Sequence, residues 1–179
     1  MNYNQILKKG ENFLKKNKIQ NPYLDVELIL SKVVKKKREE IILNTNNKLK
    51  NTDILKFNNY LLRRHQNEPM AYILGYKHFW KNKFLTNKSV LIPRPDTEII
   101  IEESLNYIPC DNSKKILDIG TGSGCIIISL LKERPKCVAT AIDISKKAIN
   151  VAKTNAKLHQ LENKINFINI DIDKYKSYN

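Results

Sequence analysis

Apolar residues recur at intervals of three and four between residues 3 and 67, which is the spacing of helices that bury one face. Asn21-Pro22 marks one helix start, because asparagine is a common cap and proline suits the first helical position. Asn51 or Thr52 is expected to cap another helix. The pattern therefore predicts that residues 1–68 form a helical bundle. A short helix is predicted at residues 38–43. The inward positions of the other helices are predicted to be Ile6, Leu7, Phe13 and Leu14; Leu24, Leu28, Ile29 and Val33; and Ile54, Leu55, Phe57, Leu61 and Leu62.

The residue types change between residues 69 and 95, where β-branched and aromatic side chains replace the helical pattern. They fall in short runs, at 72–74, 78–80, 84–85 and 90–92, and polar residues 81–83 interrupt them. Such a sequence is typical of a β-hairpin. We expect Trp80, within this segment, to pack against the core rather than line a site. Residues 69–95 are therefore predicted to be a hairpin linker.

From residue 116 onward, short apolar strands alternate with apolar helices. The strands are predicted at 116–119, 138–143 and 165–171, and this alternation predicts an α/β domain over residues 96–179, with a parallel sheet and helices on both faces. Three strands are few for such a sheet, and the third would leave an open edge, which natural sheets avoid. We therefore expect the sequence to be the front part of a longer protein.

A glycine-rich turn, Gly120-Thr121-Gly122-Ser123-Gly124, joins the first of these strands to the following helix. Dinucleotide sites favour G-x-G-x-x-G, whereas the spacing here is G-x-G-x-G, with Cys125 where the third dinucleotide glycine would fall. Asp118 precedes the first glycine by two residues. This pattern resembles the S-adenosylmethionine loop of class I methyltransferases. A strand-to-helix turn without a ligand is the alternative.

Acidic residues end the next two strands. Asp143 follows the loop by about 20 residues, where an acid can accept both hydroxyl hydrogens of a ribose. Its alternative role is to cap the next helix, although Ser145 can do that alone. Two roles are open for Asp171: it could accept a hydrogen bond from an adenine amino group, or cap the next segment. Both acids belong to the carboxyl ends of strands, where ligands of such sheets bind.

The segment from Pro93 to Glu98 stiffens the entry to a helix that is predicted to run to about Tyr107. Asp96 or Thr97 is expected to cap this helix. A rigid helix entry explains the segment without any ligand. An arginine and two acids, Arg94, Asp96 and Glu98, nevertheless stand on this stiffened turn, so the segment could reach the ligand.

The chain carries a formal net charge of +14, from 32 Lys and Arg against 18 Asp and Glu. Such an excess could attract RNA, ribosomes or an acidic protein. The basic residues are mostly lysines spread along the whole chain, and no arginine–aromatic stripe marks a nucleic-acid groove, so compositional drift in an AT-rich genome is the preferred explanation.

Other features narrow the class of protein further. No stretch approaches the roughly 20 apolar residues of a membrane span, and the polar N-terminus is not a signal peptide. An odd number of cysteines without C-x-x-C predicts reduced thiols and a cytoplasmic protein. The three histidines are scattered, so no metal site is expected.

Four motifs occur in a fixed order: Glu68-Pro69-Met70-Ala71-Tyr72-Ile73-Leu74-Gly75, then His78-Phe79-Trp80, then residues 91–98, then residues 116–124. Together they resemble the HemK/PrmC family, the peptide chain release factor glutamine methyltransferases. The resemblance implies a helical bundle for substrate recognition, a hairpin linker and the first half of a Rossmann-like class I methyltransferase domain. It also implies methyl transfer from S-adenosylmethionine to the glutamine amide in the Gly-Gly-Gln loop of release factors. We expect the complete protein to be a monomer.

The resemblance also assigns site residues. Gly120, Thr121, Gly122, Ser123 and Gly124 would wrap the methionine part of the cofactor, and Asp143 would hold the ribose hydroxyls. Asp171 and Ile172 would lie near the adenine, with Ile172 where relatives often place an aromatic residue. Asp118, Arg94 and Thr97 would stand near the cofactor with less defined roles.

The catalytic signature of the family, Asn-Pro-Pro-Tyr, is not in this sequence. We expect it beyond Asn179, so no catalytic residue is assigned here, and amide methylation by this chain alone is not expected. Two alternatives stay open: an amino-methyltransferase acting on RNA or DNA bases, and an inactive cofactor-binding fragment. An NAD-dependent oxidoreductase is less favoured because of the glycine spacing.

Overall fold

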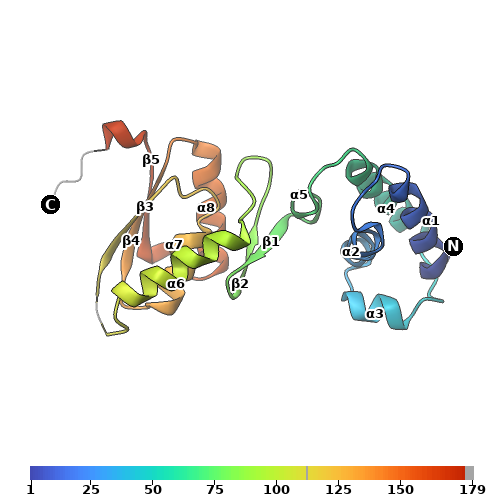
Figure 1. The fold of residues 1–179 in the computed structure, drawn as a ribbon, viewed down its shortest axis with the longest axis horizontal. Helices are drawn as coiled ribbons and strands as arrows, with labels where there is room; N and C mark the ends of the chain where they lie inside the picture. The colour runs from blue at the N-terminus through green and yellow to red at the C-terminus, as the bar shows by residue number, and fades with distance from the viewer. Residues whose placement is uncertain (112, 176–179) are drawn as a thin grey trace. The chain divides into compact units, whose positions relative to one another are not determined.

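The computed structural model describes residues 1–111 and 113–175, and the chain divides into two compact units, Met1–Leu74 and Gly75–Asn179 (Figure 1). Asn179 itself lies outside the described residues. No helix among the residues described is both long and apolar enough to span a membrane. The first unit is helical, as its sequence predicts. Its helices are α1 (Tyr3–Lys15), α2 (Pro22–Val34), α3 (Arg38–Leu43), α4 (Asn51–His65) and α5 (Met70–Leu74).

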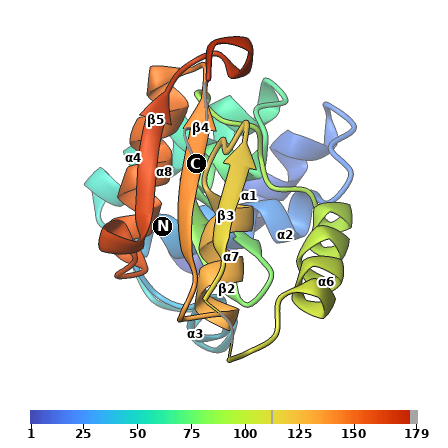
Figure 2. The ribbon, with the colours of Figure 1, turned by 90° about the vertical axis from the view of Figure 1, so that its left-hand side faces the viewer.

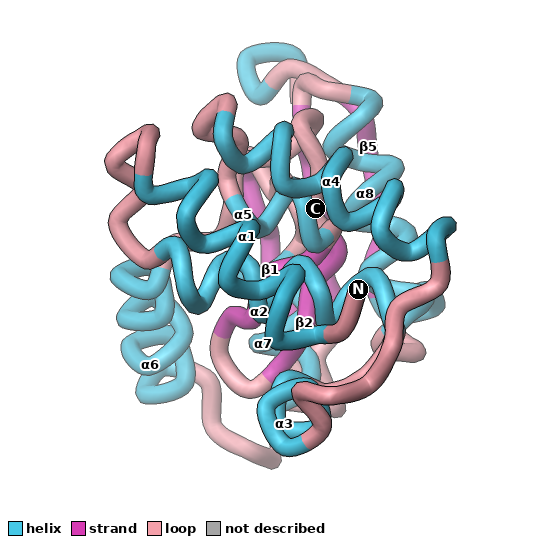
Figure 3. Tube along the Cα trace, turned by 90° about the vertical axis from the view of Figure 1, so that its right-hand side faces the viewer, coloured by secondary structure: helices cyan, strands magenta, loops and turns pink. Residues whose placement is uncertain are grey.

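Helices α1, α2 and α4 pack against one another around the core of the first unit (Figure 3). Asn2 begins α1 with a capping box, in which its side chain accepts a hydrogen bond from the backbone N–H of Gln5 at 2.9 Å. Gly10 permits the close crossing, because a Cβ there would stand 3.0 Å from Val26 Cγ1 and 3.1 Å from the Phe57 ring. The largest fully buried side chains of this core are Ile6, Leu14, Ile29, Leu30, Ile41, Phe57 and Ile73.

The buried faces of α2 and α4 differ in part from the sequence prediction. Leu24, Leu55 and Leu62 are exposed, so their predicted inward orientation is wrong. Asp25 and Glu27 are buried instead, and both are paired: Arg64 Nε lies 2.6 Å from Asp25 Oδ2, and Arg38 Nε lies 2.6 Å from Glu27 Oε2. A buried carboxylate is tolerated when a cation neutralises it, so these ion pairs allow α2 to turn acids inward.

The predicted caps also need correction. Helix α4 begins at Asn51, and Lys50 occupies the cap position without a side-chain capping bond, so neither Asn51 nor Thr52 caps it. Asn21 does precede α2, but its side chain makes no capping bond either.

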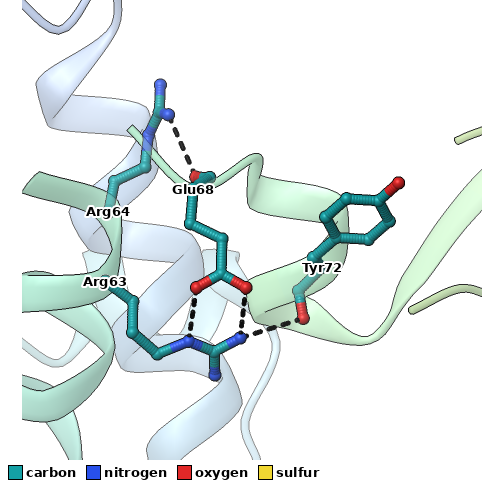
Figure 4. A network of polar contacts seen from close by, with 4 residues as sticks. All are labelled: Arg63, Arg64, Glu68 and Tyr72. Carbon is teal, nitrogen blue, oxygen red and sulfur yellow. Dashed lines mark hydrogen bonds and ion pairs between the residues drawn. The ribbon is translucent and has the colours of Figure 1, made fainter. Parts of the chain in front are cut away.

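The segment after α4 is helical, so the β-type interpretation of residues 72–74 is wrong. The Tyr72 N–H donates to the Pro69 carbonyl at 3.0 Å, and Ile73 is buried in the core of the helical unit. Glu68, just before this segment, is bound to two arginines of α4 through both its side chain and its backbone (Figure 4). Its carboxylate accepts two hydrogen bonds of 2.8 Å from Arg63, and its carbonyl accepts one of 3.1 Å from Arg64. Tertiary packing and this arginine clamp override local β-propensity.

The second unit begins with the predicted hairpin. β1 (Tyr76–Phe79) and β2 (Asn82–Leu85) pair antiparallel, whereas residues 90–92 form no strand. Trp80 lies in the turn and packs against the core, as expected, and its Nε1 donates to Glu133 at 2.8 Å. The remaining helices and strands are α6 (Glu98–Tyr107), β3 (Lys115–Ile119), α7 (Cys125–Glu133), β4 (Val138–Asp143), α8 (Lys146–Leu158) and β5 (Ile165–Asn169).

The sheet has the order β3-β4-β5, and all neighbours are parallel. This is the order of one half of a doubly wound sheet, so the predicted fold class is confirmed. Helix α7 connects β3 to β4, and α8 connects β4 to β5, so both connections step across the sheet in the same direction. Because connections between parallel strands are right-handed, α7 and α8 must lie on the same face of the sheet. Figure 2 shows α7 and α8 behind the sheet, α6 beside β3, and no described helix in front of the strands. The prediction of helices on both faces is therefore wrong for the described residues.

Apolar side chains lie on the face of the sheet that these helices leave uncovered. Leu117 is 44% exposed, Ile119 56% and Val138 46%. In the parallel register Leu117 pairs with Thr140, and Thr140 with Asn166, so this face is a mixed apolar and polar surface. Adjacent exposed apolar side chains of this kind mark surfaces that bind other apolar groups.

We predict that the 179-residue chain binds the dye 8-anilinonaphthalene-1-sulfonate through this face. Replacing Leu117 and Val138 together by threonine keeps β-propensity and removes apolar area, so dye fluorescence should fall by at least half. Leu55→Gln is the matched control, because Leu55 is an exposed leucine of α4. Equal loss of fluorescence in the control and the double variant would contradict the assignment.

Candidate functional site

The glycine loop lies where β3 ends and α7 begins. The N–H groups of Gly120 and Thr121 both donate to the Ile142 carbonyl, at 2.9 and 3.0 Å, so the loop is fixed to β4. Gly124 donates to the Thr121 carbonyl at 2.8 Å and closes the turn from which α7 starts. The loop is therefore held at the carboxyl edge of the sheet, as the sequence predicts.

Asp143 ends β4 beside this loop. Its Oδ2 accepts a hydrogen bond from the Gly122 N–H at 2.9 Å, and its Oδ1 accepts one from the Ser145 N–H at 2.8 Å. Each carboxylate oxygen has a second lone pair, and the residue is half-buried, so it can accept further hydrogen bonds from a ligand. Ser145 caps α8 through a 3.2 Å bond from Ala148 N–H, which leaves Asp143 without the capping role.

Asp118, near the end of β3, is a partly buried acid beside the glycine loop. Thr121 Oγ1 donates to its Oδ2 at 2.7 Å. Burial raises the pKa of Asp118; the hydrogen bond from Thr121 acts in the opposite direction, and the charge of Asp143 raises the pKa further. Two acidic side chains, Asp118 and Asp143, therefore lie close enough beside the glycine loop to interact.

Two glycines of the loop meet different surroundings. Gly122 has φ +55°, and a Cβ there would find only the Gly120 carbonyl, at 3.9 Å, so this side of the loop is open. Gly124 has φ +78°, and a Cβ there would stand 3.0 Å from Ile128 Cδ1 and 3.3 Å from Ala152 Cβ. The loop thus faces open space on one side and packs tightly against α8 on the other.

We predict that Gly124→Ala lowers the free energy of unfolding by about 2–4 kcal/mol, because it adds steric overlap to a left-handed backbone. Gly122→Ala adds no steric overlap and only strains the left-handed backbone, so it should lower the free energy of unfolding by about 1–2 kcal/mol. Urea denaturation followed by circular dichroism measures both values. Equal destabilisation by the two variants would contradict the asymmetry of the loop.

The residues after β5 reach the same edge of the sheet. Asp171 Oδ1 accepts from the Asp173 N–H at 3.2 Å, so its capping role is present, and Ile172 is partly exposed next to it. Sequence analysis missed Asn169, whose Nδ2 donates to the carbonyls of Asp143 and Ile144 at 2.9 and 2.8 Å. Asn169 at the end of β5 is therefore hydrogen-bonded to the backbone at the end of β4, next to Asp143.

The segment before α6 is less closely tied to the loop. Arg94 is exposed and precedes a 3₁₀ turn, Pro95–Thr97, and Thr97 makes no side-chain capping bond. Among the described residues, neither Arg94 nor Thr97 hydrogen-bonds to the glycine loop, so their place near a ligand stays a prediction. Glu98 accepts a 2.8 Å bond from the Trp80 N–H and so holds the hairpin turn.

Comparison with known proteins matches both units. Residues 5–75 match the PrmC N-terminal domain, and residues 110–179 match a methyltransferase domain. The chain is 43% identical over 143 residues to the release factor glutamine methyltransferase of Buchnera aphidicola, covering 80% of this chain and 52% of that protein. Both units of the chain are therefore similar to proteins of the PrmC family. The corresponding protein of Coxiella burnetii is 39% identical over 144 residues, with the same coverage, so the chain spans about half the length of these curated PrmC-family relatives.

A solved structure, a SAM-dependent methyltransferase from Agrobacterium tumefaciens, matches with a TM-score of 0.45 and 24% identity over 52% of this chain and 31% of that chain. The PrmC N-terminal match ends at residue 75, next to the boundary between the two compact units at Leu74 and Gly75. Helix α5 therefore belongs to the PrmC N-terminal domain, although its residues were predicted to be part of the hairpin linker.

Proposed function

We propose that this protein is a methyltransferase that uses S-adenosylmethionine to methylate the glutamine side-chain amide in the Gly-Gly-Gln loop of peptide chain release factors. The observation that carries the proposal is the PrmC N-terminal domain followed, in one chain, by a glycine loop hydrogen-bonded to Asp143. The names of the curated relatives support the substrate.

The site fits this cofactor better than it fits a dinucleotide. The N–H groups of Gly120, Thr121, Gly122 and Gly124 donate to protein acceptors, so these four groups are not available to a diphosphate. Asp118 and Asp143 add negative charge beside the loop. S-adenosylmethionine carries a positive sulfonium and a positive ammonium, which such surroundings favour. These observations disfavour the NAD-dependent alternative.

Different residues would bind different parts of the cofactor. Gly120, Thr121, Gly122, Ser123 and Gly124 would enclose its methionine part, with Gly122 facing open space, where a ligand can approach the backbone. Asp143 would accept the ribose hydroxyls with its remaining lone pairs. Asp171 and Ile172 would lie near the adenine, and Asp118, Arg94 and Thr97 nearby. The cofactor itself supplies an electrophilic methyl group.

No residue of the 179 is assigned to activate the glutamine. An amide nitrogen is a weak nucleophile, because its lone pair is delocalised, so acceptors that aim it at the methyl group are needed. Orientation of this kind can supply roughly 7–11 kcal/mol of a barrier. The Asn-Pro-Pro-Tyr motif that does this in the family is not in the sequence. We therefore expect cofactor binding by these residues, and methyl transfer only together with that motif.

The proposal also covers the binding partner, the oligomeric state and the cellular location of the protein. The helical unit would recognise the release factor, the protein would act as a monomer in the cytoplasm, and nucleic acid would not be its substrate. These assignments rest on the family and on the spread of the lysines along the chain.

Two measurements test the proposal. Calorimetric titration of the 179-residue chain with S-adenosylhomocysteine should show binding at one site. Protein purified from its native source should transfer labelled methyl groups to a release factor, and not to a release factor whose loop glutamine is replaced by alanine. Labelling that survives this replacement would overturn the glutamine assignment. Salt-sensitive labelling of added RNA in place of the release factor would favour the base-methylating alternative.

A further inference from the structure

Asn155 is a buried polar residue on the otherwise apolar inner face of α8. It is 0% exposed and is flanked along this face by Ala152 and Ala156, both also 0% exposed. Sequence analysis did not single it out; the only signal is one amide side chain within a stripe of alanines and isoleucine. A buried side-chain amide needs hydrogen-bond partners, and those of Asn155 lie on two other segments of the chain.

The first partner is the outer edge of the hairpin. Asn155 Oδ1 accepts from the Leu85 N–H at 2.7 Å, and its Nδ2 donates to the Leu85 carbonyl at 3.0 Å. Four residues further along the chain, His159 is the C-cap of α8, and its Nε2 lies 2.9 Å from the Lys83 carbonyl. Both backbone groups of Leu85 are thus satisfied by one side chain, in the way a neighbouring strand would satisfy them.

The second partner is the glycine loop. Asn155 Nδ2 also donates to the carbonyl of Ser123 at 2.8 Å, through a fully buried hydrogen bond. This carbonyl lies between Gly122, whose N–H bonds Asp143, and Gly124, which packs against Ala152. Both hydrogens of the Asn155 amide are therefore used, one on the hairpin and one on the loop.

We propose that Asn155 is a positioning residue that holds the glycine loop in its cofactor-binding shape and couples that shape to the docking of the hairpin. The proposal rests on the proposed function, because it takes the loop to bind S-adenosylmethionine. Among the described residues, other bonds between hairpin and helices, such as those from Trp80 to Glu133 and from Lys132 to Asn82, do not reach the loop. Asn155 alone of these contacts joins all three segments.

His159 provides a matched control. It is the C-cap residue of the same helix, bonds the same edge of β2 and packs on Phe84, with ring centroids 5.0 Å apart, but it has no bond to the glycine loop. Asn155→Ala and His159→Ala should both lower the thermal unfolding midpoint, because each removes an anchor of the hairpin. A purely structural role for Asn155 would make the two variants alike in every other respect.

The first readout is binding of S-adenosylhomocysteine by calorimetry, at a temperature where both variants are folded. We expect the dissociation constant to rise at least tenfold for Asn155→Ala and less than twofold for His159→Ala. Equal changes in the two variants would overturn the proposal. If Asn155→Ala does not fold, Asn155→Asp replaces it: the carboxylate repels the Ser123 carbonyl, and affinity should recover as the pH falls and the acid can donate a proton.

The second readout needs no cofactor. Amide hydrogen exchange at Gly122 and Gly124 should accelerate at least tenfold in Asn155→Ala and stay unchanged in His159→Ala, where faster exchange is confined to the hairpin. Unchanged exchange in the loop of Asn155→Ala would overturn the positioning role. If the unmodified chain fails to bind S-adenosylhomocysteine while the exchange result holds, the proposed function fails and the positioning of the loop by Asn155 stands.

Discussion

Replacing Asp143 by asparagine is expected to weaken binding of S-adenosylhomocysteine by about 100-fold. A hydrogen bond to a charged acceptor contributes about 1.5–3 kcal/mol, and two ribose hydroxyls would share this carboxylate. The substitution also turns an NH₂ group toward the N–H of Gly122 or of Ser145, both of which now donate to the carboxylate. The loop would therefore lose an anchor together with a ligand acceptor.

Calorimetric titration measures this loss, and urea denaturation checks that the variant is folded. Glu103→Gln is the control for a general loss of negative charge, because Glu103 is exposed on α6. An affinity of Asp143→Asn within threefold of the unmodified chain would exclude Asp143 from the ribose site. It would leave Asp143 with its structural bonds to the backbone only.

Replacing Arg64 by leucine is expected to lower the free energy of unfolding of the helical unit by about 3–5 kcal/mol. The substitution leaves Asp25 buried and unpaired, and an uncompensated buried charge is far more costly than the pair. Arg64 also donates to the Glu68 carbonyl, so the start of α5 would loosen as well. Helical circular dichroism in urea reports the transition.

Two further variants make this prediction specific. Replacing Asp25 by leucine together with Arg64 should recover most of the stability, since an apolar pair can replace a buried ion pair. Lys15→Ala removes the exposed ion pair between Lys15 and Glu11 and should cost less than about 1 kcal/mol. A loss of less than about 1 kcal/mol in Arg64→Leu would contradict the importance of the buried pair.

The sequence predicted those parts of the fold in which local pattern and tertiary packing agree. The short helix at residues 38–43, the hairpin and the three parallel strands all occur. The inward acids of α2 could not be predicted from apolar spacing, because Asp25 and Glu27 are stable there only through arginines 11 and 39 residues further along the chain. Helix α5 escaped prediction for a similar reason, since contacts of Glu68 and Ile73 decide its shape.

Some residues of the candidate site were likewise predictable from the sequence, and others were not. The glycine loop and Asp143 follow from spacing and the order of strands, and the structure brings them into direct contact. Asn155 and Asn169 were missed, because an asparagine side chain that bonds distant backbone groups leaves no periodic signal. Sequence patterns identify groups that can face a ligand more readily than groups that hold them in place.

The strand order has a consequence for how the chain acquires its structure during synthesis. Each strand of the parallel sheet pairs with the next one along the chain, and the helix between them lies on the sheet that they form. Every pairing in this sheet can therefore form as soon as the second strand of the pair leaves the ribosome, without waiting for later residues. The glycine loop would gain its first anchors as soon as β4 is made, because the carbonyl of Ile142 and the carboxylate of Asp143 both come from that strand, and its last anchor, Asn155, would follow with α8.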